Sequence, residues 1–300
     1  MTGTTQIIRG ARAAGIVVPA FNIPYLPMLR PVVQAVHDED SFALVQVARL
    51  EWEKFSSGSL EAVAEEFHRY DDSAHVRLHL DHVPVIDEDH REVDYLPILR
   101  RALTAGYQSV MVDGSRLALE QNIRATRAAT ELAHAAGIPC EAELGAVLGH
   151  EEGPLPPYEE LFASGRGFTD PEEAARFVRE SGCDWLSVAI GNIHGAVSKA
   201  ARDQKKVEAR LHLEHLARLA EVTGIPLVLH GGSGIRPEDL RRSFARGIAK
   251  LNVGTEIRQA YEAALRETGS EEKGREAVYH RTRGLLSETY RISGSRAKLP

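Results

Sequence analysis

Three histidines follow separate apolar segments of the chain, and an aspartate precedes one of them. Asp81 and His82 end the segment VRLHLDH, and His194 and His230 follow two later apolar segments. Neutral imidazoles are good ligands for Zn²⁺, and three protein ligands leave the open coordination position that a catalytic zinc needs. The pattern therefore predicts a zinc site of His82, His194 and His230, with Asp81 beside it as a general acid or base.

The alternative is that the histidines are structural residues of the core, and that Asp81 only orients a histidine or caps the next helix. Asp81 and His82 are adjacent, so their side chains would point to opposite faces of an ideal strand. Both can reach one site only where the strand ends and its pleat relaxes. We expect such a relaxed strand end at Asp81.

Glycine-rich turns follow the segments that carry His194 and His230. Glycine lets backbone N–H groups approach a ligand closely, and neighbouring hydroxyl and amide side chains add hydrogen bonds. We expect a phosphate to bind there, with Lys199 as a local positive charge. The alternative is that the glycines only make tight turns and that Lys199 is a solvated surface residue. The expected contacts are Gly195, Gly231, Gly232, Ser233, Gly234, Asn252 and Thr255.

Short apolar segments recur along the chain and predict strands, and segments with helical spacing separate them. The clearest helix is expected over 169–182, with Thr169 or Asp170 as its cap, Pro171 just inside and Gly182 at its end. A second is expected over 236–247. Strands that are apolar on both faces and alternate with helices predict a parallel sheet covered by helices. The candidate strands are GIVVPAFN, FALVQVA, VRLHLDH, SVMVDGS, PCEAELG, WLSVAIGN, PLVLHGG and IAKLNVG.

Eight such units predict a (β/α)₈ TIM barrel that forms one domain over residues 1–300. An open doubly wound sheet fits less well, because it usually has fewer strands and a glycine-rich turn after the first, which FNIPYLP lacks. Barrels place their active sites at the carboxyl ends of the strands, where the polar residues fall here. The polar segment after about Gly274 predicts a helical tail (274–300) that covers the barrel or forms an oligomer interface.

Composition narrows the classes of partner. A net charge of −7 argues against broad attraction to nucleic acid or to acidic membranes. Cys140 and Cys183 are too few for a disulfide framework and lack zinc-thiolate spacing, so we expect them to be packing residues. No segment approaches the roughly 20 apolar residues of a membrane span. We expect a cytoplasmic protein that binds a small molecule and contacts neither nucleic acid nor membrane.

Several segments together resemble the class II, zinc-dependent ketose-bisphosphate aldolases, a family that includes fructose- and tagatose-bisphosphate aldolases. They are VPAFN, LHLDH, SVMVDGS, EAELG, AIGNIHG, LVLHGGSG and KLNVGT, in the family's order over about residues 17–256. The resemblance implies a lyase of carbohydrate metabolism, such as glycolysis. The implied reaction is reversible retro-aldol cleavage of a ketose 1-phosphate or 1,6-bisphosphate to dihydroxyacetone phosphate and an aldehyde, through a zinc-stabilised enediolate. A homodimer or homotetramer is the family expectation.

The resemblance also implies roles for individual residues. Asp81 would act on the C4 hydroxyl, and Glu151, in a loop after the fifth strand, on the proton at C3. Lys199 matches a lysine of the tagatose-type branch. The implied zinc ligands are His82, His194, His230 and, near the metal or as an alternative ligand, Glu143. The implied substrate and phosphate contacts, with a monovalent cation near the phosphate, are Asn22, Gly195, Lys199, Gly231, Gly232, Ser233, Asn252, Gly254 and Thr255.

The chain departs from the family where the aldehyde would bind. After the second strand the family has a serine and small residues, whereas this chain reads VARLEWEKFSS and places Arg49 and Glu51 at the mouth. The segments VPVIDEDHREVD and AVSKAARDQKKVEARLHLEHL also differ. We expect Arg49 to recognise the distal group of an atypical aldehyde. The alternative is that Arg49 is a surface residue of an irregular loop.

Other functions remain open on the sequence. A zinc-dependent sugar-phosphate isomerase or epimerase would use the same enediolate without bond cleavage, and a non-catalytic sugar-phosphate sensor would keep only the fold. Schiff-base aldolase chemistry needs a desolvated lysine. WLSVAIGN has none, and Lys250 precedes the end of its strand, so we do not expect that chemistry.

Overall fold

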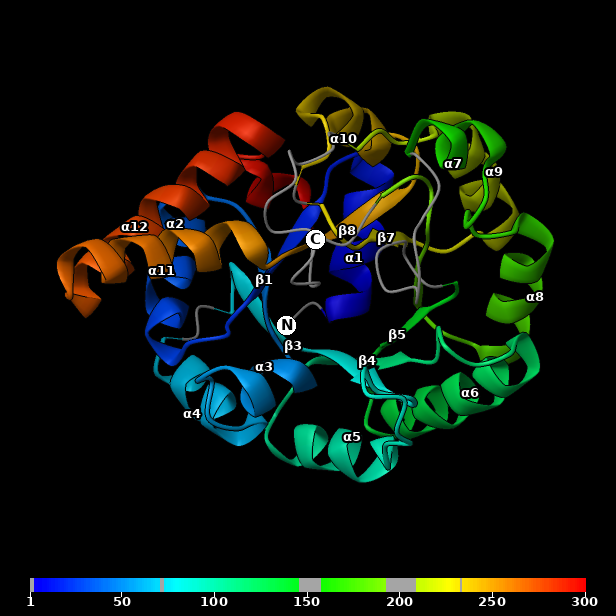
Figure 1. Ribbon diagram of the computed structural model, residues 1–300, viewed down its shortest axis with the longest axis horizontal. Helices are drawn as coiled ribbons and strands as arrows, with labels where there is room; N and C mark the ends of the chain where they lie inside the picture. Colours follow the sequence, from blue (N-terminus) through cyan, green and yellow to red (C-terminus); the bar gives the residue numbers. More distant parts are fainter. Residues whose placement is uncertain (1–2, 71–72, 146–157, 193–208, 233) are drawn as a thin grey trace.

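The strands form a closed barrel. The computed structural model describes residues 3–70, 73–145, 158–192, 209–232 and 234–300. Within them, eight parallel strands pair in sequence order, and β8 closes the ring against β1. Helices surround the strands (Figure 1). The predicted fold class, a TIM barrel, is confirmed.

The elements alternate along the chain. The strands are β1 (Val18–Asn22), β2 (Ala43–Ala48), β3 (Val76–Pro84), β4 (Ser109–Asp113), β5 (Cys140–Glu143), β6 (Trp185–Ser187), β7 (Leu227–Leu229) and β8 (Ile248–Val253). The α-helices are α1 (Thr4–Ala14), α2 (Leu29–Asp38), α3 (Arg49–Lys54), α4 (Leu60–Tyr70), α5 (Tyr95–Thr104), α6 (Leu119–Ala135), α7 (Tyr158–Ser164), α8 (Pro171–Ser181), α9 (Leu213–Thr223), α10 (Pro237–Phe244), α11 (Thr255–Thr268) and α12 (Glu271–Gly284). Shorter helical turns are η1 (Leu26–Met28), η3 (Leu285–Tyr290) and η4 (Ser295–Lys298).

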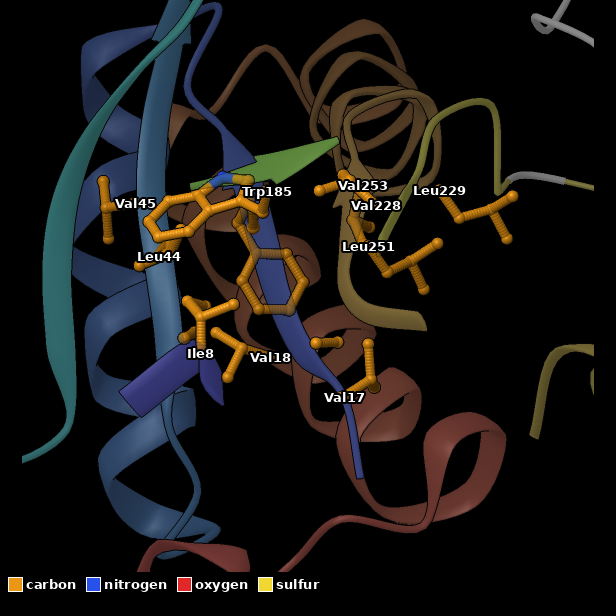
Figure 2. Close-up of a cluster of buried hydrophobic side chains, with 14 of the residues drawn as sticks. Ile8, Val17, Val18, Leu44, Val45, Trp185, Val228, Leu229, Leu251 and Val253 are labelled. Atoms are coloured by element: carbon orange, nitrogen blue, oxygen red, sulfur yellow. The ribbon is translucent and has the colours of Figure 1, made fainter. Parts of the chain in front are cut away.

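The strands are buried on both faces, as a parallel sheet between a barrel core and outer helices requires. Every residue of β1, β2 and β7 is buried. Figure 2 shows Trp185 of β6 in a cluster with branched side chains of β1, β2, β7 and β8 and with Ile8 of α1. Burial of this apolar surface is the main favourable contribution to the stability of the barrel.

Local capping explains the helix bounds. The Asp170 carboxylate accepts hydrogen bonds from the Glu172 and Glu173 N–H groups at 2.8 and 2.9 Å, and Gly182 ends α8 with a left-handed φ of 73°. The predicted bounds of this helix are therefore confirmed. Helix α10 is shorter than expected, because it ends at Phe244 and the chain continues through a turn to Gly247.

Two expectations about the strand ends are corrected, and so is the alternative of an irregular loop after β2. β3 continues past His82 to Pro84, and β6 ends at Ser187, so residues 188–192 are buried without being part of the strand. The segment after β2 is helix α3 and not an irregular loop, with the Glu51 carboxylate accepting a hydrogen bond from the Ala48 N–H at 2.8 Å. This helix places Arg49 and Glu51 beside the ends of the barrel strands.

The last part of the chain packs on the outside of the barrel. Helix α12 begins at Glu271 and packs against α11 and α2 (Figure 1). A side chain at Gly274 would meet the Tyr261 ring at 2.7 Å, so a glycine permits the close approach of α12 to α11. Cys140 and Cys183 are buried free thiols. Among the described helices, none combines the length and apolar character that crossing a membrane requires.

Candidate functional site

An irregularity in β3 brings Asp81 and His82 to the same site. The pairing of β3 with β4 shifts register between Leu80 and Val83, and His82 has a φ of 24°. A bulge of this kind re-aims side chains that a regular strand would point to opposite faces. Both residues therefore line one cavity, although the relaxed segment lies within the strand and not at its end.

The two described histidines of the predicted zinc site lie together. The ring centroids of His82 and His230 are 4.5 Å apart. The Glu143 carboxylate lies 2.9 Å from His230 Nδ1 and 3.9 Å from His82 Nδ1, and Asp113 Oδ2 lies 3.1 Å from His82 Nδ1. A carboxylate on one ring nitrogen orients a histidine so that the other can face a metal, which is the arrangement at His82.

The carboxylates determine the charge of these rings. Burial alone would lower the pKa of His82, but the charges of Asp81, Glu143 and Asp113 raise it to about 10. Burial would lower the pKa of His230 as well, but the charge of Glu143 and the hydrogen bonds to Glu141 and Glu143 raise it. The pKa of Asp113 is lowered, because the bond to His82 outweighs burial. The site is thus a cluster of ionised carboxylates that favours a cation.

Two amides hold the Asp81 carboxylate in place. Asn22 Nδ2 donates to Asp81 Oδ2 at 3.0 Å and Asn252 Nδ2 donates to Asp81 Oδ1 at 2.9 Å. Gln46 Nε2 in turn donates to Asn22 Oδ1 at 2.7 Å, and Lys250 Nζ donates to Asn252 Oδ1 at 2.7 Å. Burial alone would raise the pKa of Asp81, but the charges of His82 and Lys250 lower it to about 2. Asp81 is therefore an ionised carboxylate that is held in a fixed orientation.

A second polar layer lies inside the barrel below this site. Glu141 Oε2 is 2.8 Å from Lys250 Nζ and accepts from Trp185 Nε1 at 2.7 Å, and Glu141 Oε1 is 3.0 Å from His230 Nε2. All four side chains are fully buried. His79 completes the layer, 2.8 Å from the Ser109 hydroxyl, and burial lowers its pKa to about 3. This layer connects His230 to the strand that carries Asn252.

A cavity of about 320 Å³ opens above Asp81, His82 and His230. Five of the predicted phosphate contacts line this cavity: Gly231, Gly232, Asn252, Gly254 and Thr255. A side chain at Gly232 would meet Leu251 Cδ1 at 2.7 Å, so glycine permits the close approach of the turn after β7 to Leu251. Thr255 is the first residue of α11, and exposed N–H groups at a helix N-terminus favour an anion.

Two amides that were predicted to contact substrate hold the Asp81 carboxylate. Asn22 and Asn252 each donate to it from the side-chain NH₂ group. Arg49 lines the cavity, as expected, and pairs with Glu53 at 2.8 Å and Asp87 at 3.7 Å. Gly234 lies next to the cavity turn at a left-handed φ of 91°. Five predicted residues lie outside the described part of the chain: Glu151, His194, Gly195, Lys199 and Ser233.

Several residues that position the site were not predicted from the sequence. Gln46, His79 and Trp185 each contact a residue of the polar network from within a strand. The available signal was spacing: His79 with Asp81, Glu141 with Glu143 and Lys250 with Asn252 each lie two residues apart. Residues at that spacing share one face of a strand, so these pairs point into the barrel together.

The donor set fits a divalent ion such as Zn²⁺. Imidazole nitrogens and carboxylate oxygens are its usual ligands outside thiolate sites. Among the described residues, two groups that include His82 have possible ligand atoms within 4.8 Å of one another: Asp81, His82 and His230, and His82, Asp113 and Glu143.

The fold is a TIM barrel, and the cluster at the carboxyl ends of its strands has the ligand types of a divalent-metal site. The chain belongs to the class II fructose-bisphosphate aldolase family, whose model, "Fructose-bisphosphate aldolase class-II", matches residues 2–295. The resemblance read from the sequence is thereby confirmed.

Individual relatives agree with this assignment. The fructose-bisphosphate aldolase of Thermus caldophilus is 34% identical over 289 residues, which cover 88% of this chain and 86% of that protein. The uncharacterized protein YdjI of Escherichia coli K12 is 36% identical over 251 residues, covering 82% and 80%. The crystal structure of the YdjI aldolase matches with a TM-score of 0.76 and 28% identity, covering 96% of this chain and 98% of that one.

Proposed function

We propose that this protein cleaves a ketose 1-phosphate or 1,6-bisphosphate to dihydroxyacetone phosphate and an aldehyde. The observation that supports the proposal most is Asp81. Its carboxylate is 1% exposed and yet is held by two amide donors in a cavity that also contains His82 and His230. A buried, ionised and fixed carboxylate is suited to take a proton from a substrate hydroxyl.

Membership of the family implies a divalent metal, and we propose that the ion is zinc. His82 and His230, together with His194 from outside the described residues, would hold it, with Glu143 beside both described rings. A bound zinc ion supplies Lewis-acid stabilisation of the negative charge that develops on the three-carbon fragment.

The protein groups would handle the protons and the phosphate. Asp81 takes the proton of the C4 hydroxyl, the C3–C4 bond breaks, and its electron pair remains on the three-carbon fragment as an enediolate while C4 becomes the aldehyde carbon. Glu151 then returns a proton to C3. The C1 phosphate binds the N–H groups at the Gly231–Gly232 turn and the start of α11. Glu151 lies outside the described residues, so its role rests on the resemblance alone.

The environment of Lys250 argues against Schiff-base chemistry. A lysine nucleophile must be a neutral amine. Lys250 is fully buried, and its Nζ is already engaged 2.8 Å from the Glu141 carboxylate and 2.7 Å from Asn252 Oδ1.

Arg49 is the proposed contact for the distal group of the aldehyde. Its side chain is 18% exposed, lines the cavity, and is oriented by Glu53 and Asp87. A guanidinium held in this way presents remaining N–H groups in fixed directions. An anionic or polyhydroxylated end of the substrate would accept from them.

The substitution Asp81→Asn tests the proposal. The amide has the same shape but cannot take a proton, so we expect kcat for cleavage to fall at least about 10²-fold while bound zinc remains near the wild-type content. Normal cleavage by this variant would refute the assignment. Conversion of the ketose phosphate without release of dihydroxyacetone phosphate would indicate an isomerase or epimerase, and sugar-phosphate binding without any turnover by the wild type would indicate a sensor.

A further inference from the structure

Glu51 is a buried acid in the wall of the cavity that the reaction above does not use. It belongs to α3, which follows β2. The residue is 9% exposed and lines the same cavity as Asp81 and His82. A carboxyl at this depth needs partners or a proton.

One amide nitrogen joins Glu51 to Asp81. Asn22 Nδ2 donates to Asp81 Oδ2 at 3.0 Å and lies 3.3 Å from Glu51 Oε2. Glu51 Oε2 also accepts from the Ala48 N–H at 2.8 Å. Within the described part of the chain, Glu51 Oε1 has no hydrogen-bond partner. The carboxyl therefore uses one oxygen to hold its place and leaves the other for a ligand in the cavity.

Two carboxyls that share one donor in a buried site do not both ionise readily. Asp81 has the second amide, Asn252, and is adjacent to His82, so the negative charge is better placed on Asp81. Glu51 has neither a second side-chain donor nor an ion-pair partner among the described residues. The proton therefore belongs on Glu51, and Oε1 is the oxygen that can carry it.

The surrounding charges agree with this division. Burial raises the pKa of Glu51 to about 8, the Asp81 charge adds to the increase, and the Ala48 N–H and the His82 charge oppose it. Helix α3 packs against β2 and β3, and Asp81 and His82 of β3 are the charged groups that act on Glu51 from there. Tyr107, before β4, also interacts electrostatically with Glu51, and its hydroxyl donates to the Leu60 carbonyl.

We propose that Glu51 is a substrate-binding acid, whose neutral carboxyl donates a hydrogen bond from Oε1 to an oxygen of the aldehyde fragment. The inference rests on the proposed aldolase function. Glu51 keeps its proton throughout, and Asp81 takes the C4 proton in cleavage and returns it in condensation. In condensation the bond from Glu51 draws electron density from the aldehyde carbonyl, which makes its carbon a better acceptor. The substrate class is a hydroxylated aldehyde.

Glu51→Gln is the decisive variant, because an amide keeps the shape and a donor but cannot ionise near neutral pH. We expect kcat/KM for cleavage by the wild type to fall above about pH 8, where Glu51 loses its proton, and the Gln variant to stay level through about pH 9. Glu51→Ala should lose at least about tenfold in kcat/KM at neutral pH. Glu65→Gln, an exposed change of the same type on α4, should follow the wild type.

A superimposable alkaline decline in the wild type and the Gln variant would overturn the proposal, as would an Ala variant with unchanged kcat/KM. Exchange of the C3 protons of dihydroxyacetone phosphate in D₂O needs no aldehyde. It therefore distinguishes a failure of the role proposed for Glu51 from a failure of the proposed aldolase function. Normal exchange with an unchanged pH profile in the Gln variant rejects the role of Glu51 only. If the zinc-loaded wild type shows no exchange and no cleavage, the aldolase function itself is rejected. Exchange also shows whether the Ala variant is folded.

Discussion

Replacing Lys250 by methionine should destabilise the barrel by about 3 kcal/mol. The substitution keeps most of the side-chain volume but removes the buried cation that pairs with Glu141 at 2.8 Å. Removing one partner of a buried ion pair costs about 3–5 kcal/mol, because the other charge stays buried without compensation. Glu141 keeps the Trp185 N–H at 2.7 Å and the His230 ring at 3.0 Å, which places the expected loss at the lower end of that range.

The assay is thermal unfolding of the metal-loaded protein, followed by circular dichroism or calorimetry. A loss of about 3 kcal/mol corresponds to a decrease in Tm of roughly 6–12 °C for a chain of this size class. Lys273→Met is the matched control. Lys273 pairs with Glu276 at 2.7 Å on the surface of α12, with both side chains about half exposed, so its loss should cost at most about 0.5 kcal/mol.

A double variant tests the cause. If the buried Glu141 charge is responsible, Lys250→Met combined with Glu141→Gln should be more stable than Lys250→Met alone, because the amide no longer needs a cation. A Lys250→Met protein with the wild-type Tm, or a double variant in which the two losses simply add, would refute this reasoning.

Two further predictions concern the metal and the aldehyde end. Carboxylates raise the pKa of His82 and His230 in the metal-free site, so a metal must displace protons from these rings. The affinity for the metal should therefore decrease as the pH decreases. Dialysis near pH 5 should remove most of the bound zinc, and retention of one full equivalent would contradict a histidine site. Arg49→Ala should raise KM for the preferred ketose phosphate about 5- to 50-fold with a smaller change in kcat. Unchanged kinetics on that substrate would reject Arg49 as a specificity residue.

The barrel was predictable because its signals are local. Strands buried on both faces read as short apolar segments, and caps such as Asp170 and Gly182 mark helix ends directly. The end of β6 was not predictable, because residues 188–190 are as buried as the strand before them and only backbone pairing separates the two. Helix α3 was not predicted because its N-cap residue is Ala48, which has no capping side chain. The Glu51 carboxylate accepts from the Ala48 N–H instead.

The candidate site was predictable in its residue types and less so in its contacts. Asp81, His82 and His230 meet as expected, but the bulge that allows it, with His82 at a φ of 24°, depends on the pairing of β3 with β4. The partners of Asn22 and Asn252 come from other strands of the closed barrel. Such contacts depend on the three-dimensional register, which a linear pattern does not contain.

Release of dihydroxyacetone phosphate shows whether the metal-loaded site cleaves a ketose phosphate. A panel of ketose 1-phosphates and 1,6-bisphosphates would be incubated with the zinc-loaded protein, with and without a chelator, and the product measured with a coupled reductase. We predict release from at least one sugar, abolished by the chelator and restored by zinc. Release that is insensitive to the chelator, or no release from any sugar by fully zinc-loaded protein, would contradict it.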